Sequence, residues 1–408
     1  MRVLLINPPS FYLENDSAYP PMGLLYLAAV IEDMGHDVEL LDLALFDEIE
    51  APLLKALDKI DLVGISCVTP NVPVVDRIIG FIHPSISVIV GGPHPTFEPF
   101  KTFNELGVSI LVGEGEEAIR EVLRDLQYNK QIRDLYGGKL VNLKSVLRPL
   151  RKLIDLKRYY PGGVQGSPIY TSRGCPFSCA FCSKISGSYY RRFSLSIVLE
   201  EISEVIQDFG ISHIVFGDDD IGLNPDLYQL IDLMKVPHRM KNVTYRLNLS
   251  ARFRDDQIFE TAFLTGCTEI SFGVESGSQK ILDSMNKNLT VQFAEEVIKR
   301  VKDYNIKSKI YLMCNFPGET EETIEETIKF VERTKPDSVF ISAFVPLPGS
   351  DIYNNPLKYG ITWVSDNWED YYTVGKNRNF GHCFETHELK FKEQEKLYNM
   401  LLKGVGLI

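Results

Sequence analysis

Three cysteines crowd into eight residues near the middle of the chain. Cys175, Cys179 and Cys182 have the spacing C-x3-C-x2-C, whereas Cys67, Cys267, Cys314 and Cys383 are scattered. Three thiolates on one short loop can hold three corners of a cubane iron–sulfur cluster, which usually has four cysteine ligands. The absent fourth ligand would leave one iron open to a small molecule.

A zinc site or a disulfide framework fits this spacing less well. Zinc sites favour C-x2-C pairs and a fourth ligand at short range, but no Cys or His follows Cys182 before His213. A disulfide framework is not expected in a chain of 408 residues with seven cysteines. Three chance core cysteines would not explain the Arg-Gly-Cys-Pro turn that carries Cys175.

With Phe181 just before the last cysteine, the loop resembles the cluster loop of radical S-adenosylmethionine (SAM) enzymes. The resemblance implies that Cys175, Cys179 and Cys182 bind a 4Fe-4S cluster. In that family the open iron binds the amino and carboxylate groups of SAM. An electron from the reduced cluster then cleaves SAM to methionine and a 5′-deoxyadenosyl radical, so an electron donor such as ferredoxin or flavodoxin is implied.

Alternating strand and helix patterns surround this loop. They predict strands at 169–172, 213–217, 243–249, 268–274, 307–314 and 338–344, and helices at 195–209, 225–234, 255–265, 277–284, 290–304 and 320–334. Six such repeats predict a partial (β/α)6 barrel, and the resemblance identifies it as a radical SAM core. The chemistry of such barrels lies at the carboxyl ends of the strands.

The resemblance implies that SAM is bound by residues at those strand ends. The expected contacts are Phe181, Gly217, Asp218, Asp219, Ser250, Arg252, Glu275, Ser276, Cys314 and Asn315. Alternatives remain for some of them: the three consecutive aspartates could form a turn or a magnesium site, Arg252 could pair with a nearby aspartate, and Cys314 could be a small core residue. No residue is predicted to act as a catalytic acid or base.

The first third of the chain predicts a second α/β unit. Strands at 2–7, 38–42, 62–66, 87–90 and 110–112 alternate with helices, which indicates a doubly wound, Rossmann-like parallel sheet. Ligands of such sheets bind beyond the carboxyl ends of the strands. No G-x-G-x-x-G follows the first strand, so a dinucleotide is disfavoured.

The loops after these strands resemble those of the cobalamin-binding domain fused to many radical SAM enzymes. The implied cobalamin contacts are Pro9, Ser66, Cys67, Val68, Thr69, Gly91, Gly92, Pro93, His94, Gly113, Glu114 and Gly115. Other cobalamin proteins take a cobalt-ligating His from the loop after the first strand, but residues 7–21 contain none. Cobalamin is therefore expected without His ligation, and His94 is expected to be a structural turn residue.

Composition narrows the partners and the location. The 55 acidic and 43 basic residues give a net charge of −12, which disfavours a general nucleic-acid binder. No stretch has the ~18 apolar residues of a membrane span, and a reducing, cytoplasmic location is expected. The predicted domains are 1–135 for cobalamin, 136–165 as a linker, 166–355 for the radical SAM core and 356–408 as a C-terminal cap.

Together these resemblances favour a cobalamin-dependent radical SAM methyltransferase. It would methylate an unactivated carbon by means of a 5′-deoxyadenosyl radical and methylcobalamin. The expected substrate is a peptide or protein, with methyl-coenzyme M reductase as one candidate, or else a small molecule. The alternatives are a cobalamin-dependent radical SAM cyclase or rearrangement enzyme and a non-enzymatic cobalamin-binding protein.

Overall fold

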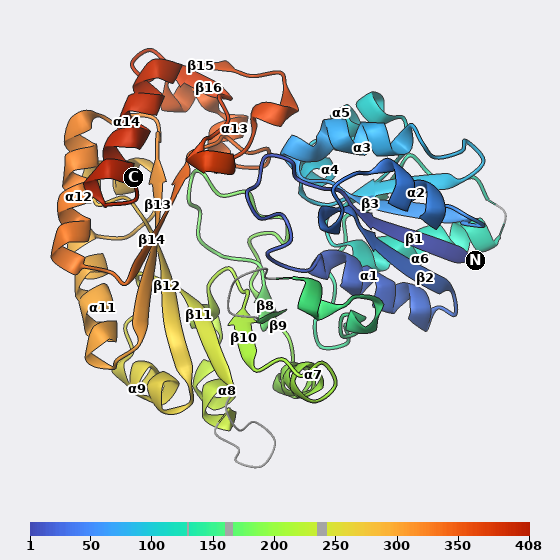
Figure 1. Cartoon of the computed structure of the whole chain (residues 1–408), viewed down its shortest axis with the longest axis horizontal. Coiled ribbons are helices and arrows are strands. Elements are labelled where there is room, and N and C mark those ends of the chain that lie inside the picture. Colours follow the sequence, from blue (N-terminus) through green and yellow to red (C-terminus); the bar gives the residue numbers. More distant parts are fainter. Residues whose placement is uncertain (129, 160–165, 235–242) are drawn as a thin grey trace. The chain divides into compact units, whose positions relative to one another are not determined.

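The computed structural model describes the whole chain except residues 129, 160–165 and 235–242. The predicted linker stretch at 160–163 therefore falls outside the described residues. The chain divides into two compact units: residues 1–163 with 367–371, and residues 164–366 with 372–408 (Figure 1). Each unit is an α/β structure, and the predicted fold class is confirmed.

Unit 1 is built on a six-stranded sheet in the order β2-β1-β3-β4-β5-β6, in which every pair is parallel. Its strands are β1 (Arg2–Asn7), β2 (Asp37–Asp42), β3 (Leu62–Ser66), β4 (Ser87–Gly91), β5 (Ser109–Val112) and β6 (Leu135–Gly137). Its helices are α1 (Met22–Asp33), α2 (Glu50–Ala56), α3 (Val72–Ile79), α4 (Pro93–Phe97), α5 (Pro99–Leu106) and α6 (Gly115–Gln127).

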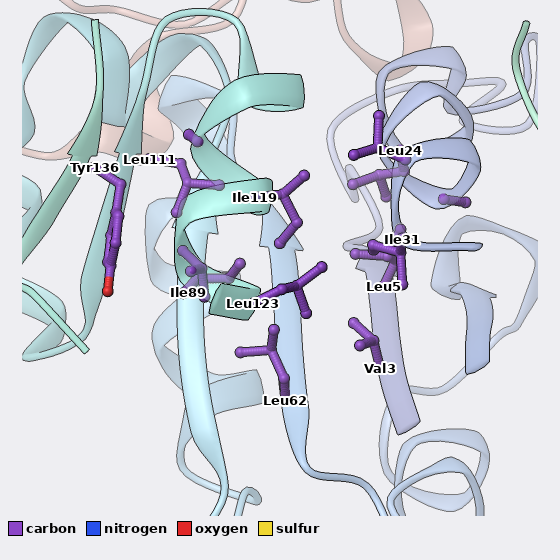
Figure 2. Close-up of a cluster of buried hydrophobic side chains, with 14 residues drawn as sticks. Val3, Leu5, Leu24, Ile31, Leu62, Ile89, Leu111, Ile119, Leu123 and Tyr136 are labelled. Atoms are coloured by element: carbon purple, nitrogen blue, oxygen red, sulfur yellow. The ribbon is translucent and has the colours of Figure 1, made fainter. Parts of the chain in front are cut away.

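One apolar core joins this sheet to two of its helices. Figure 2 shows Leu24 and Ile31 of α1 beside β1, and Ile119 and Leu123 of α6 over the neighbouring strands. The helices approach closely because Gly115 opens α6, and a Cβ there would lie 2.8 Å from the Leu27 side chain. This burial of leucine and isoleucine holds the loops at the carboxyl edge in fixed places.

Unit 2 contains a second parallel sheet, in the order β14-β13-β12-β11-β10-β7. These strands are β7 (Ser167–Ile169), β10 (His213–Phe216), β11 (Thr244–Ser250), β12 (Cys267–Glu275), β13 (Lys307–Cys314) and β14 (Ser338–Ala343). The helices are α7 (Leu195–Gln207), α8 (Leu227–Leu233), α9 (Asp256–Leu264), α10 (Gln279–Ser284), α11 (Val291–Asp303), α12 (Glu321–Thr334), α13 (Asp351–Asn354) and α14 (Phe391–Gly404).

The helices cover one face of this sheet, with α9, α11 and α12 along the same side in Figure 1. Alternate residues of β13 show the consequence, because Ile310, Leu312 and Cys314 are fully buried while Lys309 and Tyr311 are only half buried. The half-buried residues lie on the opposite, inner face of the partial barrel.

The structure differs from the predicted elements in several short segments. The first barrel strand ends at Ile169, and Ser172–Arg173 (β8) instead pairs antiparallel with Arg191–Arg192 (β9). Helices α4 and α5 and strand β6 were not predicted. Near the end of the chain, β15 (Ile361–Val364) and β16 (Phe384–Thr386) form an unpredicted antiparallel pair. Among the residues that the structure describes, no helix combines the length and apolar character that a membrane crossing demands.

One short segment belongs to a different unit from its chain neighbours. Asn367–Tyr371, which we call the strap, packs in unit 1, although the residues on either side of it belong to unit 2. Its 3-10 turn, Trp368–Asp370, lies against α3 and against the turn Thr69–Asn71 that follows β3. The strap thus completes unit 1 from a distant part of the sequence.

Candidate functional site

The three clustered cysteines lie on a loop between β8 and β9 of unit 2. All three are free thiols and partly exposed, whereas the other four cysteines are buried. Burial, with smaller contributions from the neighbouring Cys179, Asp219 and Cys175, raises the pKa of Cys182 to about 11. These thiols are close enough to repel one another when charged, which is the electrostatic problem that a bound iron–sulfur cluster relieves.

Two turns from elsewhere in the barrel hold this loop. The first follows α10: the Met285 carbonyl accepts a 2.8 Å hydrogen bond from the Ala180 N–H, and the Asn286 amide donates to the Ser178 carbonyl at 2.8 Å. The second is the first turn of α13 itself, where the Ile352 N–H donates to the Ala180 carbonyl at 3.1 Å. The loop is therefore tied on both sides through its backbone.

The donor set fits a 4Fe-4S cluster. The three thiols are free and partly exposed, and three cysteines are one fewer than such clusters usually have. Among the residues that the structure describes, no group of three or more His, Cys, Asp or Glu side chains converges in the manner of a mononuclear metal site. A cubane spreads its thiolates over separate irons, so that finding does not bear on it.

A buried ion pair lies beside the cluster loop. Glu275 ends β12 with a left-handed backbone (φ 73°), and its carboxylate is 2.8 Å from the Lys287 ammonium. Burial lowers the pKa of Lys287, but the nearby Glu275 carboxylate outweighs it and keeps the pKa above its usual value. The same ammonium is 5.5 Å from the centroid of the Phe181 ring.

Arg252 places a second cation at the loop. Its guanidinium lies 3.4 Å from the centroid of the Phe177 ring, which is a cation–π contact. Its Nε donates to the Ser250 hydroxyl at 2.9 Å, and Nη1 donates to the Lys287 carbonyl at 3.0 Å. The Phe177 and Phe181 rings of the cluster loop thus each face a positive charge, and these two cations suit an anionic ligand at the open iron.

The three consecutive aspartates after β10 have separate roles. Asp218 is buried and accepts hydrogen bonds from the Thr171 N–H and hydroxyl and from the Ser172 hydroxyl. Burial raises its pKa to about 6 in spite of these donors. Because these donors occupy its carboxylate, we assign Asp218 to positioning the segment before Cys175.

Asp219 is the aspartate of this run that faces the cysteines. It is exposed, and its charge raises the pKa values of both Cys175 and Cys182. Asp220 instead accepts from the N–H groups of Gly222 and Ser250. Gly217 is packed under the Tyr170 ring, where a Cβ would lie 2.8 Å from a ring carbon.

Two further predicted SAM residues point away from the inner face. Ser276 is buried, and its hydroxyl lies 3.3 Å from the Thr327 hydroxyl of α12. Cys314 is among the buried, helix-facing residues of β13. Both occupy packing positions in the barrel wall, so the structure does not support direct contacts to SAM from these two side chains.

Asn315 follows β13 and differs from its neighbour Cys314. It has a left-handed backbone (φ 70°), and its N–H donates to the buried Glu319 carboxyl. Its side-chain Nδ2 is buried without a partner among the described residues. Because an unpaired buried amide is costly, Asn315 is suited to bind a ligand at this strand end.

In unit 1 the loops at the carboxyl edge of the sheet are joined to one another by hydrogen bonds. Asn71 donates to the Ser10 hydroxyl at 3.1 Å, which ties the loop after β3 to the loop after β1. The Gly113 N–H donates to the Thr96 hydroxyl at 3.0 Å, which ties the loop after β5 to that after β4. All four predicted cobalamin loops are brought to one edge of the sheet, and they contain the predicted residues Pro9, Ser66, Val68, Pro93, Glu114 and Gly115.

The loops after β3 and β4 meet most closely at Cys67 and Gly92. The Cys67 N–H donates to the Gly91 carbonyl at 2.7 Å, and the His94 N–H donates to the Cys67 carbonyl. Gly92 has φ 113°, and a Cβ there would lie 2.8 Å from the Cys67 oxygen. Only glycine permits this approach. The buried Cys67 thiol has a raised pKa because of its burial.

His94 is buried at the same place. Its Nδ1 lies 3.3 Å from the Thr69 hydroxyl, and its ring meets the Trp368 ring of the strap edge-on at 4.6 Å between centroids. Burial, aided by Lys101, lowers the pKa of His94 to about 4, so the ring is neutral at pH 7. The side chain therefore joins two loops to the strap, in agreement with a structural role. The four loops meet at the carboxyl edge of the sheet, which is where ligands of such sheets bind.

Several residues of these sites were not found from the sequence. The Lys287 ammonium pairs with Glu275, and the Asn286 amide donates to the cluster loop. Within the loop itself, the Lys184 ammonium donates to the Phe177 carbonyl. Lys287 and Asn286 come from a turn more than a hundred residues beyond the cysteines, so no short spacing could reveal them. Trp368 is more distant still from the loops that it covers.

Comparisons with known proteins match one known domain to each of the two units. The radical SAM superfamily model matches residues 169–331, and the B12 binding domain model matches residues 14–123. A Pyrococcus horikoshii protein named as an uncharacterized methyltransferase is 28% identical over 92% of this chain and 87% of its own length. The anaerobic magnesium-protoporphyrin IX monomethyl ester cyclase of Cereibacter sphaeroides is 24% identical over 86% of this chain and 63% of its own length.

Among solved structures, the radical SAM methyltransferase TsrM from Kitasatospora setae is similar with a TM-score of 0.78. The match covers 98% of this chain and 88% of that one, at 18% identity. A 4Fe-4S cluster, SAM and cobalamin are the cofactors that the two matched domains imply. The chain is an enzyme of the cobalamin-dependent radical SAM family that includes methyltransferases.

Proposed function

We propose that the protein transfers a methyl group to an unactivated carbon atom. The observation that carries the proposal is the partly exposed C-x3-C-x2-C loop, fixed beside Lys287 and Arg252, in a chain that also has a B12 binding domain. When bound, the cofactors supply the radical and the methyl group, which is why no protein acid–base pair is required. The methyltransferase names of the Pyrococcus and Kitasatospora proteins support this direction.

Different residues of the barrel would bind the oppositely charged groups of SAM. Arg252 and Lys287 would hold the SAM carboxylate, because both cations lie at the cluster loop. Asp219 would accept from the ammonium group, and Asn315 would donate its unpaired Nδ2 to the adenine or ribose. Glu275 keeps Lys287 charged and oriented. The hydrogen-bonded loops of unit 1 would hold cobalamin without a histidine on cobalt, since His94 is buried against Trp368.

The test begins with anaerobic reconstitution with iron, sulfide and hydroxocobalamin, followed by desalting. We expect about four irons and one cobalamin per chain. The chain is then supplied with a reductant and with SAM that carries a deuterated methyl group. Replacement of Cys175, Cys179 and Cys182 by Ala should abolish release of 5′-deoxyadenosine. A variant without these cysteines that still cleaved SAM would disprove the assignment of the cluster.

A second candidate function is radical cyclisation without methyl transfer. It is favoured by the similarity to a protein named as a magnesium-protoporphyrin ester cyclase. The deuterated methyl group separates the two functions, because only the methyltransferase transfers it to a product. A carbon in a peptide or protein, with methyl-coenzyme M reductase as one candidate, remains a prediction from the sequence.

A further inference from the structure

The inner face of the barrel carries an aromatic pair that the proposed SAM site does not use. Tyr311 of β13 and Phe340 of β14 are register partners, and their rings meet at 5.7 Å between centroids with an interplanar angle of 69°. Phe340 is 41% exposed, although it lies within a strand of the central sheet. Tyr311 is half buried. A partly exposed aromatic pair inside a barrel is costly to leave facing water and indicates a surface for an apolar ligand.

A lysine adds a charge to this pair. The Lys309 ammonium lies 5.2 Å from the Tyr311 ring centroid and 5.9 Å from that of Phe340. Across the described part of the chain, no carboxylate lies within ion-pair distance of it. In a protein with net charge −12, a lysine without an acidic partner on a half-buried face is complementary to an anionic ligand.

This surface adjoins the proposed SAM site. Tyr311 is the register partner of Gly273 in β12. A Cβ on Gly273 would lie 2.8 Å from a Glu275 carboxylate oxygen and 3.4 Å from the Lys287 ammonium. Neighbouring strands are about 4.8 Å apart, so Tyr311 and Phe340 lie roughly 5 and 10 Å from the Glu275–Lys287 side of the site. A ligand resting on the pair would therefore be close to the SAM side of the barrel.

We propose that Lys309, Tyr311 and Phe340 form a substrate shelf for a small molecule that has a planar aromatic or conjugated ring and an anionic group. The ring packs on Tyr311 and Phe340, and the anion pairs with Lys309. The width of two strands matches a ring system and not an extended protein surface. This inference rests on the proposed function and names its substrate class.

The test uses equilibrium dialysis of the cluster-reconstituted full chain against two probes of the same shape. Naphthalene-2-carboxylate carries the ring and the anion, whereas 2-naphthalenemethanol carries the ring alone. The wild type should bind the carboxylate at least about fivefold more tightly, as expected for one nearby opposite charge. Equal binding of the two probes, or binding of neither, would overturn the proposal.

Lys309→Gln should remove this preference for the carboxylate. Lys307→Gln is the matched control, because Lys307 lies on the same face of β13 at its exposed end, two residues away. It should keep the preference, and loss of the preference in both variants would show general charge attraction in place of the shelf. Phe340→Ser should weaken both probes about equally, and unchanged binding would overturn the part assigned to the rings.

Iron content per chain is measured for each variant to confirm an intact barrel. The probe experiment needs neither SAM cleavage nor cobalamin, so its result is separate from the test of methyl transfer. A wild-type chain that discriminates the probes but transfers no methyl group would keep the shelf and disprove the methyltransferase. A chain that transfers methyl groups but does not discriminate the probes would do the reverse.

Discussion

Asn286 and Asn288 form a natural matched pair beside the cluster loop. Both have left-handed backbones (φ 51° and 55°) and both are exposed. The Asn286 amide donates to the Ser178 carbonyl at 2.8 Å and to its hydroxyl at 3.1 Å. The side chain of Asn288 makes no such bond to the described residues. The two positions therefore differ in what they contribute to the loop and not in backbone conformation.

We expect Asn286→Gly to release iron to a chelator about three- to tenfold faster than the wild type. Glycine keeps the backbone conformation, and the loss of hydrogen bonds worth about 1 kcal/mol loosens the loop. Asn288→Gly should match the wild type. The measurement is the anaerobic loss of cluster absorbance with a ferrous chelator. Equal rates in the two variants would show that Asn286 does not position the loop.

Glu319 gives the barrel a pH dependence with a definite sign. Its pKa is raised to about 8 by burial, so the folded protein binds a proton that the unfolded chain releases above the ordinary carboxyl pKa. The stabilising contribution is complete below that ordinary pKa. It is lost by up to about 1.4 kcal/mol per pH unit as the pH rises towards 8.

Glu319→Gln should remove this dependence, because the amide oxygen can still accept from the Asn315 N–H and carries no proton to lose. The measurement is the urea midpoint of unfolding at pH 5, 6, 7 and 8. The urea midpoint of the variant should rise relative to that of the wild type as the pH rises. A constant difference between the two proteins across this range would contradict the protonated state of Glu319.

The sequence predicted some residues of the site well and others poorly, for physical reasons. Chemistry that depends on close spacing, such as Cys175, Cys179 and Cys182, is visible in the sequence. Asp218 and Asp219 looked equivalent there, because neighbouring aspartates differ only in which one is buried by the fold. Lys287 contacts Glu275 only because a helix and a turn return the chain to the same strand end.

Strands and helices with a clear period were also predictable. The alternating pattern of β13 indicated a strand, and it also separates Lys309 and Tyr311 from the helix-covered residues Ile310 and Leu312. The short helices α4 and α5 were not predicted, because residues 91–96, with Pro93 and Pro95, were interpreted as a loop. Proline is accepted in the first turn of a helix, and in both helices it stands there.

The strap contributes a buried side chain to unit 1, and loss of that side chain should destabilise the unit. Trp368 is 6% exposed, its Nε1 donates to Glu105 at 3.1 Å, and the Lys101 ammonium is 3.9 Å from the centroid of its ring. Trp368→Ala should destabilise unit 1 by about 3–5 kcal/mol, as for other large buried aromatic residues. Hydrogen exchange in 66–71 and 91–96 should become faster, and cobalamin should be lost more readily on desalting.

Trp363→Ala is the control for this variant, because Trp363 lies near the strap in the sequence but is 44% exposed and belongs to unit 2. It should leave exchange in the loops of unit 1 unchanged. If Trp368→Ala also left these rates unchanged, the strap would be a passive surface segment. If both variants accelerated exchange equally, the effect would not be specific to the buried ring.

For the molecule as a whole, the division into units does not follow the order of the chain. A fragment that ends at residue 163 contains every strand of the first sheet but lacks the strap. We expect it to fold with the same sheet and with the loops after β3 and β4 less protected than in the full chain. Hydrogen exchange compares the two, and equal protection would show that His94 needs no cover from Trp368.

Because the strap lies far along the chain from the rest of unit 1, unit 1 is completed late during synthesis. Residue 371 leaves the ribosome roughly 200 residues after residue 163, which is about 10–40 s later at the usual speed of translation. During that interval the cysteine loop and most of the barrel are synthesised, while unit 1 still lacks the strap. A newly made chain can therefore receive its iron before the edge that would hold cobalamin is complete.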